Sequence, residues 1–197
     1  MNDYVKQFVP SMKELNDERC DFLEDAFNFA DHNVDQMNLQ SEIEKLLVFA
    51  WIVERRNKTE RFEIHPTGHS GKLGFLSSHV SSDCLDIYAV APQFKINKFK
   101  ADFVFWHACY YGSNETDESR VVVECDGHEF HERTKHQAAS DKSREREIQT
   151  AGFPVLRFTG SEIWKNPREC VSQIDIFLGK QTHRISIARW KSASLPE

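Results

Sequence analysis

The segment RVVVECDGHEFH, residues 120–131, places two carboxylates and two histidines directly after a run of valines. The β-branched run predicts a buried strand, and because side chains alternate along a strand, Glu124 and Asp126 would point the same way. Neighbouring carboxylates repel each other unless they share a cation, and a hard cation such as Mg²⁺ takes oxygen ligands. The spacing therefore indicates a metal site at a strand end, with His128 and His131 within reach of it. The alternative is a solvated strand end followed by a turn.

Two further acidic residues could join this site. Asp102 is the only charged residue in the apolar run ADFVFWHAC, residues 101–109, which predicts a strand. A lone buried carboxylate needs a partner, and Glu124 on a neighbouring strand would supply one if the two shared a Mg²⁺ ion. Glu44 ends the sequence SEIE at the start of a predicted helix, where it either caps the helix or contributes to the site. A bound metal would lower the pKa of a water and stabilise charge on a phosphate oxygen.

The elements that would position these residues follow from hydrophobic periodicity and capping signals. In chain order we expect helices over 11–31 and from Ser41, strands over 62–65, 84–91, 101–109 and 120–125, a helix over 136–151 ending at Gly152, a strand over 153–158, and a helix over 166–179 ending at Gly179. Residues 32–40 and 110–119 are expected to be polar connections. The three strands with short connections predict an antiparallel meander, whereas the strand after the 136–151 helix should run parallel to the preceding one.

The two ends of the chain carry opposite charge. Residues 1–40 contain nine acidic and three basic residues, whereas residues 132–191 contain twelve basic and seven acidic residues. A local basic face favours phosphate contacts even though the net charge is −6. The acidic 11–31 helix either packs on its own chain or forms a dimer or protein-partner surface. The basic end, residues 180–197, is expected to be a loosely docked tail.

Composition limits the class of protein. The chain of 197 residues with 40% hydrophobic residues can bury a core. It has no apolar run of the roughly 18 residues that span a membrane and no signal-peptide pattern at its start, so we expect a cytoplasmic protein without membrane contact. Its five cysteines form no C-x-x-C pair, which indicates reduced thiols. A zinc hydrolase using His65, His69 and His79 is a weaker alternative, because these residues lie on no predicted regular element and lack cysteine partners at finger spacing.

Taken in order, the motifs resemble those of restriction-endonuclease-like nucleases, whose signature is an Asp, then Glu or Asp, one residue, and Lys. More narrowly, the chain is similar to the very-short-patch-repair endonucleases and a related family of bacterial proteins. The matching segments are SEIEKLL (41–47), ADF (101–103), VECDGHEFH (123–131), DKSR (141–144) and GFPVLRF (152–158).

The resemblance implies an α/β, three-layer fold with a central mixed β-sheet flanked by helices, here with an extra N-terminal helix. It implies an endonuclease-like domain over residues 41–179. An acidic helical extension over residues 1–40 would precede this domain, and a basic tail over residues 180–197 would follow it.

The resemblance also assigns roles. Asp102 and Glu124 would be the core metal ligands with Glu44 as a third, and His131 matches a histidine that can act as a base. Asp126 stands where the superfamily has its lysine, so it would only support the site. Proton handling would then fall to His131, to Lys142 or to no side chain.

A second pair of residues carries two interpretations. Asp141 and Arg144 match a polar pair that follows the active-site loop in the related proteins. Their alternative is an ion pair between residues three apart on one helix.

The function implied is a Mg²⁺-dependent endodeoxyribonuclease, with Mn²⁺ as an alternative cation, which hydrolyses phosphodiester bonds of DNA in repair, restriction or phage defence. The alternative is a catalytically inactive nucleic-acid- or protein-binding module on the same fold. It is motivated by Asp126 at the lysine position and by the acidic N-terminal helix.

Overall fold

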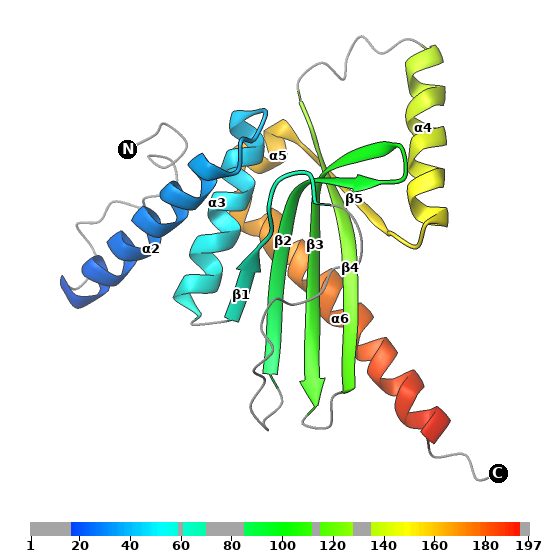
Figure 1. Ribbon diagram of the computed structural model, residues 1–197. Coiled ribbons are helices and arrows are strands. Elements are labelled where there is room, and N and C mark those ends of the chain that lie inside the picture. The colour runs from blue at the N-terminus through cyan, green and yellow to red at the C-terminus, as the bar shows by residue number, and fades with distance from the viewer. Residues whose placement is uncertain (1–16, 59–60, 70–84, 112–114, 128–134, 194–197) are drawn as a thin grey trace.

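The computed structural model describes residues 17–58, 61–69, 85–111, 115–127 and 135–193 (Figure 1). Its strands are β1 (Arg61–Ile64), β2 (Leu85–Ile96), β3 (Phe99–Tyr111), β4 (Glu115–Asp126) and β5 (Val155–Thr159). Its helices are α2 (Asp17–Gln36), α3 (Glu42–Asn57), α4 (Lys135–Thr150), α5 (Gly160–Lys165) and α6 (Pro167–Ala193).

The five strands form one mixed sheet in the order β1-β2-β3-β4-β5. β2, β3 and β4 are antiparallel neighbours, whereas β1 runs parallel to β2 and β5 runs parallel to β4. The predicted meander and the predicted parallel strand after α4 are therefore confirmed. α4 ends at Thr150, and the predicted stop signal Gly152 follows with a φ of +84°, which favours glycine.

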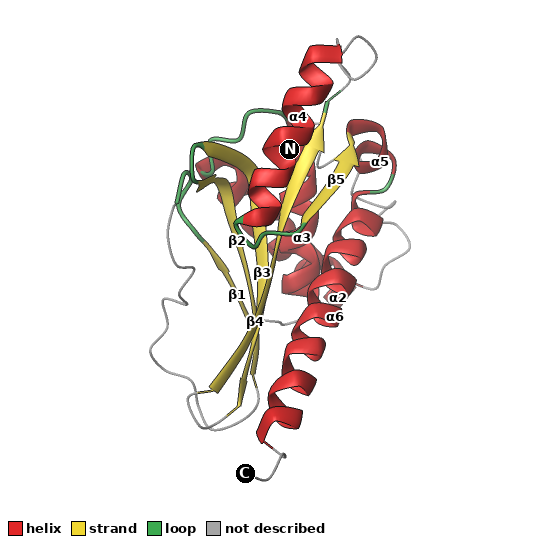
Figure 2. Ribbon diagram, turned by 90° about the vertical axis from the view of Figure 1, so that its right-hand side faces the viewer, coloured by secondary structure: helices red, strands yellow, loops and turns green. Residues whose placement is uncertain are grey.

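Helices cover the two faces of the sheet unequally (Figures 1 and 2). Val121 and Val123 of β4 point into a core shared with α2, α3 and α6. Val122 points to the opposite face, where Ile148 of α4 and Trp106 of β3 pack against it. This arrangement confirms the three-layer α/β fold with a central mixed sheet.

α3 is buried on all sides over most of its length. Its residues from Leu46 to Val53 are at most 1% exposed, although the sequence predicted only one buried stripe. The reason is its position between α2 and the layer formed by the sheet and α6. The Trp51 ring lies 5.5 Å from Phe105 of the sheet, and Phe49 stacks on Phe27 of α2 at 5.8 Å.

The N-terminal helix packs on its own chain, as one of the two interpretations predicted. α2 begins at Asp17 within the described residues and continues to Gln36, so the polar connection expected over 32–40 is wrong for its first five positions. Val34 and, just after the helix, Met37 are buried and extend the apolar face toward α3. This packing lends no support to a dimer surface on that face.

The last helix does not end at Gly179 but continues to Ala193, so the prediction of a loosely docked tail is wrong over residues 180–193. A glycine inside a helix costs about 1 kcal/mol, and buried polar contacts offset this cost. Thr182 Oγ1 lies 2.7 Å from Ser119 Oγ and 3.0 Å from His107 Nδ1. Farther along α6, Arg189 binds the buried Asp117 at 3.0 Å.

These contacts also explain why β4 begins at Glu115, inside the segment expected to be a polar loop. Asp117 and Ser119 face α6 and are satisfied by its side chains and by the carbonyl oxygen of Leu178. The predicted division into domains over 1–40, 41–179 and 180–197 stays a prediction. None of the helices that the structure describes is long and apolar enough to cross a membrane.

Arg55 offers a test of how α3 is joined to α6. It is 1% exposed, forms an ion pair with Asp175, and lies 3.9 Å above the ring of Tyr88. We expect Arg55→Ala to lower the free energy of unfolding by about 2–3 kcal/mol, because it leaves a half-buried carboxylate poorly paired. Arg56 is the matched control: its pair with Asp25 is exposed, so Arg56→Ala should cost less than about 1 kcal/mol. Urea unfolding measures both; equal losses would contradict the expectation.

Candidate active site

Asp102 and Glu124 lie at the same end of two neighbouring central strands. Phe103 and Val123 are the last register pair of β3 and β4 at this end, and Asp102 and Glu124 are the next residues of the two strands. Asp102 Oδ2 accepts a hydrogen bond of 2.8 Å from the backbone N–H of Cys125. The two carboxylates are therefore close in the fold, while their role as shared metal ligands stays a prediction.

Glu124 is buried and is neutralised by an arginine from α4. Its side chain is 6% exposed, and Arg144 donates one hydrogen bond of 2.9 Å to each of its two carboxylate oxygens. The same guanidinium donates a bond of 2.7 Å to the carbonyl oxygen of Lys100. These two parallel charge-assisted hydrogen bonds fix the orientation of the Glu124 carboxylate.

A second ion pair lies beside the first. Arg157 of β5 is the register partner of Glu124, and its guanidinium lies 3.1 Å from Asp126 and 3.5 Å from Glu145 of α4. Sequence reasoning did not select Arg157. The signal was available, because Arg157 is a single charge in the apolar strand FPVLRF, the same kind of anomaly that identified Asp102.

Glu44 reaches this region from the start of α3 and also caps the helix. Its carboxylate accepts hydrogen bonds from Ser41 Oγ at 3.1 Å, from the Gln40 N–H at 3.1 Å and from Gln93 Nε2 at 3.2 Å. Gln93 has a φ of +52° and lies between the β2 residues that pair with Phe103 and Ala101. No sequence signal pointed to Gln93, because its role depends on this local backbone conformation.

The carboxylates raise one another's pKa. Burial and then the charge of Asp102 raise the pKa of Glu124 to about 7, although Arg144 acts in the opposite direction. Burial raises the pKa of Asp102 as well, with Asp126 adding to the effect. Burial, together with Asp102, raises the pKa of Glu44. The three predicted ligands thus form one electrostatically coupled group at one end of the sheet.

The oxygen chemistry of this group suits a hard cation. In the arrangement shown, however, both oxygens of Glu124 bind Arg144. Within the described ranges, no group of three His, Cys, Asp or Glu side chains is arranged to hold a metal ion. The donors therefore fit Mg²⁺ by type, whereas in the arrangement shown Arg144 occupies both oxygens of Glu124.

The remaining site predictions are placed as follows. Lys142 is exposed on α4, and His131 and His128 lie outside the described residues, so the proton-handling role stays a prediction. Arg144 of α4 binds Glu124 of β4, which favours a site role for this arginine. The role of Asp141 stays a prediction. For the zinc alternative, the rings of His65 and His69 lie 5.2 Å apart, and His79 is outside the described residues.

Residues 85–178, just under half of the chain, match the model of REase_MTES_1575, a restriction-endonuclease-like family. The match runs from β2 to the middle of α6 and includes Asp102, Glu124 and Arg144. Together with the mixed sheet flanked by helices, it supports a restriction-endonuclease-like nuclease and implies DNA binding. The narrower likeness to very-short-patch-repair endonucleases stays a prediction. No curated protein and no solved structure matches the chain.

The raised pKa of Glu124 predicts how stability depends on pH. An unfolded Glu titrates at about 4.3, whereas the pKa of Glu124 in the folded protein is about 7. The folded state therefore holds the extra proton, and this stabilising contribution is complete below about pH 4.3 and is lost as pH rises through 7. In this window the Glu124 titration should lower the free energy of unfolding by up to about 1.4 kcal/mol per pH unit, and we expect Glu124→Gln to abolish that decrease.

Urea unfolding of the wild type and of Glu124→Gln between pH 4 and 8 measures this slope. Asp102→Asn should make the slope shallower, since the Asp102 charge is the second cause of the shift. A Glu124→Gln variant with the wild-type slope would contradict the expectation.

Proposed function

We propose that the protein is a Mg²⁺-dependent endodeoxyribonuclease that hydrolyses phosphodiester bonds of DNA, with Mn²⁺ able to replace Mg²⁺. The observation that supports it is a pair of neighbouring carboxylates, the half-buried Asp102 and the buried Glu124, within the segment that matches a restriction-endonuclease-like family. Buried acids without a structural need for charge are costly to keep in a core, and catalytic sites are where such groups collect.

Asp102 and Glu124 would hold the ion, with Glu44 as the third carboxylate. When bound, the ion would supply a Lewis acid for a phosphate oxygen and a more acidic water. Burial disfavours the charged form of these carboxylates and so raises their pKa. A bound cation would stabilise that charged form. Loading should accordingly release protons near neutral pH.

Arg144 would act as a counterion that exchanges partners. In the arrangement shown it neutralises Glu124; once Glu124 turned to a cation, its guanidinium would be available to a phosphate of the DNA backbone. Asp126, at the superfamily's lysine position, holds Arg157 at 3.1 Å and so orders a second cation beside the site. Lys142 or His131 would handle protons.

One observation favours the second candidate, a nucleic-acid- or protein-binding module without catalysis. Arg144 makes hydrogen bonds with both carboxylate oxygens of Glu124 and so supplies the charge that a metal would otherwise supply. A chain in which this pair never opens would keep the fold and the basic residues for phosphate contacts without cutting DNA.

Cleavage of supercoiled plasmid in Mg²⁺ or Mn²⁺ tests the enzyme proposal. We expect the wild type to nick or linearise the plasmid, and Asp102→Asn and Glu124→Gln to be slower by about two orders of magnitude or more, because each loses a charge that binds the ion. Glu118→Gln is the control, since Glu118 is also on β4 but is the register partner of Ala108, far from Asp102 along β3. Equal rates for Asp102→Asn and the wild type would exclude the assignment.

Calorimetric titration with Mn²⁺ separates the two candidates. If Arg144 competes with the ion for Glu124, Arg144→Gln should bind Mn²⁺ about tenfold more tightly, since two charge-assisted hydrogen bonds no longer have to be broken. Arg146→Gln, an exposed arginine on the same helix, should bind as the wild type does. Binding by neither the wild type nor Arg144→Gln would favour the non-catalytic module.

A further inference from the structure

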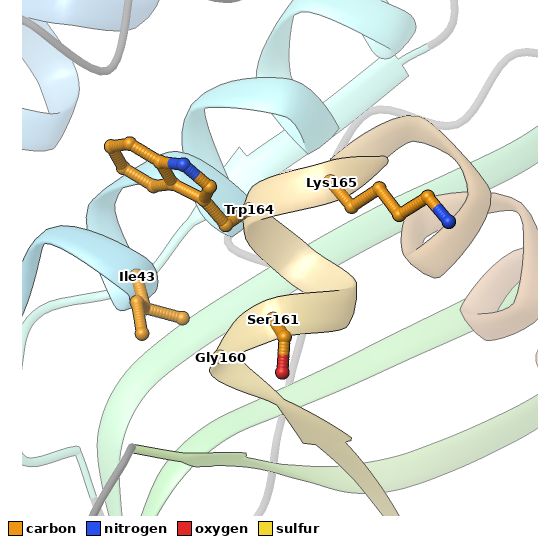
Figure 3. A pocket seen from close by; sticks show the side chains of 5 residues that line it. All are labelled: Ile43, Gly160, Ser161, Trp164 and Lys165. Carbon is orange, nitrogen blue, oxygen red and sulfur yellow. The ribbon is translucent and has the colours of Figure 1, made fainter.

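A pocket of about 550 Å³ lies between α3 and α5. It is lined by Ile43, Gly160, Ser161, Trp164 and Lys165. Its volume is within the range of about 300–1,000 Å³ that small-molecule sites occupy. Figure 3 shows the Trp164 indole on the same side of α5 as Ile43, whereas the Lys165 side chain extends to the other side.

Trp164 is unusually exposed for its size. It is 46% exposed, while Trp51 and Trp106 are almost completely buried in the core. The aliphatic surface of Ile43 lies near the ring across the pocket (Figure 3). A flat guest would therefore meet an aromatic ring and an aliphatic side chain, with a basic residue nearby.

The pocket adjoins the segments that carry two of the site acids. Ile43 directly precedes Glu44, and Gly160 follows Thr159, the register partner of Asp126. A methyl group on Gly160 would collide with Ile43 Cδ1 and would lie 3.5 Å from the carbonyl oxygen of Asp126. The pocket is therefore next to the proposed active site.

We propose that this pocket binds one unpaired nucleobase of the DNA strand, stacked on Trp164. The proposal rests on the proposed function, because the ion that the carboxylates would hold would bind the strand whose base enters. A base inside a duplex already stacks on its neighbours and cannot offer its face to a ring in a pocket. The site would thus accept a single-stranded or extruded nucleotide.

Other occupants fit less well. A second copy of the chain would need an interface of roughly 1,200 Å² or more, and five residues around a pocket do not provide one. An apolar peptide would leave the adjoining carboxylate site unused, whereas a nucleotide combines a flat ring for the pocket with a phosphate for the ion that those carboxylates would hold. Stacking on an aromatic side chain is tolerant of base identity, so the pocket would not by itself select a sequence.

The test compares two labelled oligonucleotides of equal charge, each about twelve nucleotides long. One is oligothymidine, and the other has the same backbone with abasic units throughout. Fluorescence anisotropy with Ca²⁺ in place of Mg²⁺ gives both Kd values, and a gel of each sample checks that the chains stay intact. We expect the wild type to bind oligothymidine about tenfold more tightly than the abasic chain, the difference that one base–aromatic stack supplies.

Trp164→Ala should bind both chains equally, and Trp164→Phe should retain most of the preference. The control is Trp190→Ala, since Trp190 is also exposed but lies near the end of α6; it should keep the wild-type preference. If Trp164→Ala keeps the preference, or the wild type has none, the base pocket is excluded while DNA binding stands. If the wild type binds neither chain, this inference fails, and the plasmid assay decides the proposed function separately.

Discussion

The burial of Glu124 at the end of a central strand is the constraint on which this end of the molecule depends. A carboxylate that is 6% exposed must be neutralised, either by a proton or by a cation. Its pKa of about 7 and its two hydrogen bonds with Arg144 are two expressions of that need. A divalent cation could neutralise the same carboxylate, so the proposed metal ion and the observed arginine would compete for Glu124.

The competition has a structural consequence, because ion pairs hold much of α4 in place. Arg144 binds Glu124, Glu145 faces Arg157, and Glu147 binds Lys98 at 3.0 Å, while Ile148 is the buried apolar residue of α4 in the core on this face. Helices α3 and α6 dock differently, through a large apolar core. An ion that took Glu124 from Arg144 would therefore loosen contacts of α4 and leave the opposite layer unchanged.

The far end of the same strands shows what a structural polar cluster looks like. His107, Ser119 and Thr182 join one another by hydrogen bonds of 2.7–3.0 Å, and Asp117 is bound by Ser186 and Arg189. There each buried group faces polar partners without crowding another acid, and the cluster fastens α6 to the sheet. At the Glu124 end the acids crowd one another, which is the arrangement expected of a site and costly for a scaffold.

Local signals in the sequence determined the elements and two of the site residues. Ser41 and Gly152 marked helix ends because capping and left-handed backbone are properties of single residues, and the valines of β4 marked a central strand. Asp102 was selected as a candidate because an isolated acid in an apolar strand needs a partner, and Glu124 because it directly follows the run of valines. The short helix α5 was missed although its capping box, Thr159 with Glu162, was present in the sequence.

Tertiary structure alone decided which distant groups meet. Strand register and helix docking decide that Arg144 pairs with Glu124 and that Gln93 pairs with Glu44. These contacts join residues 20 and 49 positions apart, whereas helix periodicity and capping extend over a few residues. The continuation of α6 beyond Gly179 depends on the buried polar network between this helix and the sheet. The sequence thus determined which side chains could do chemistry, and the fold decided that an arginine shares their site.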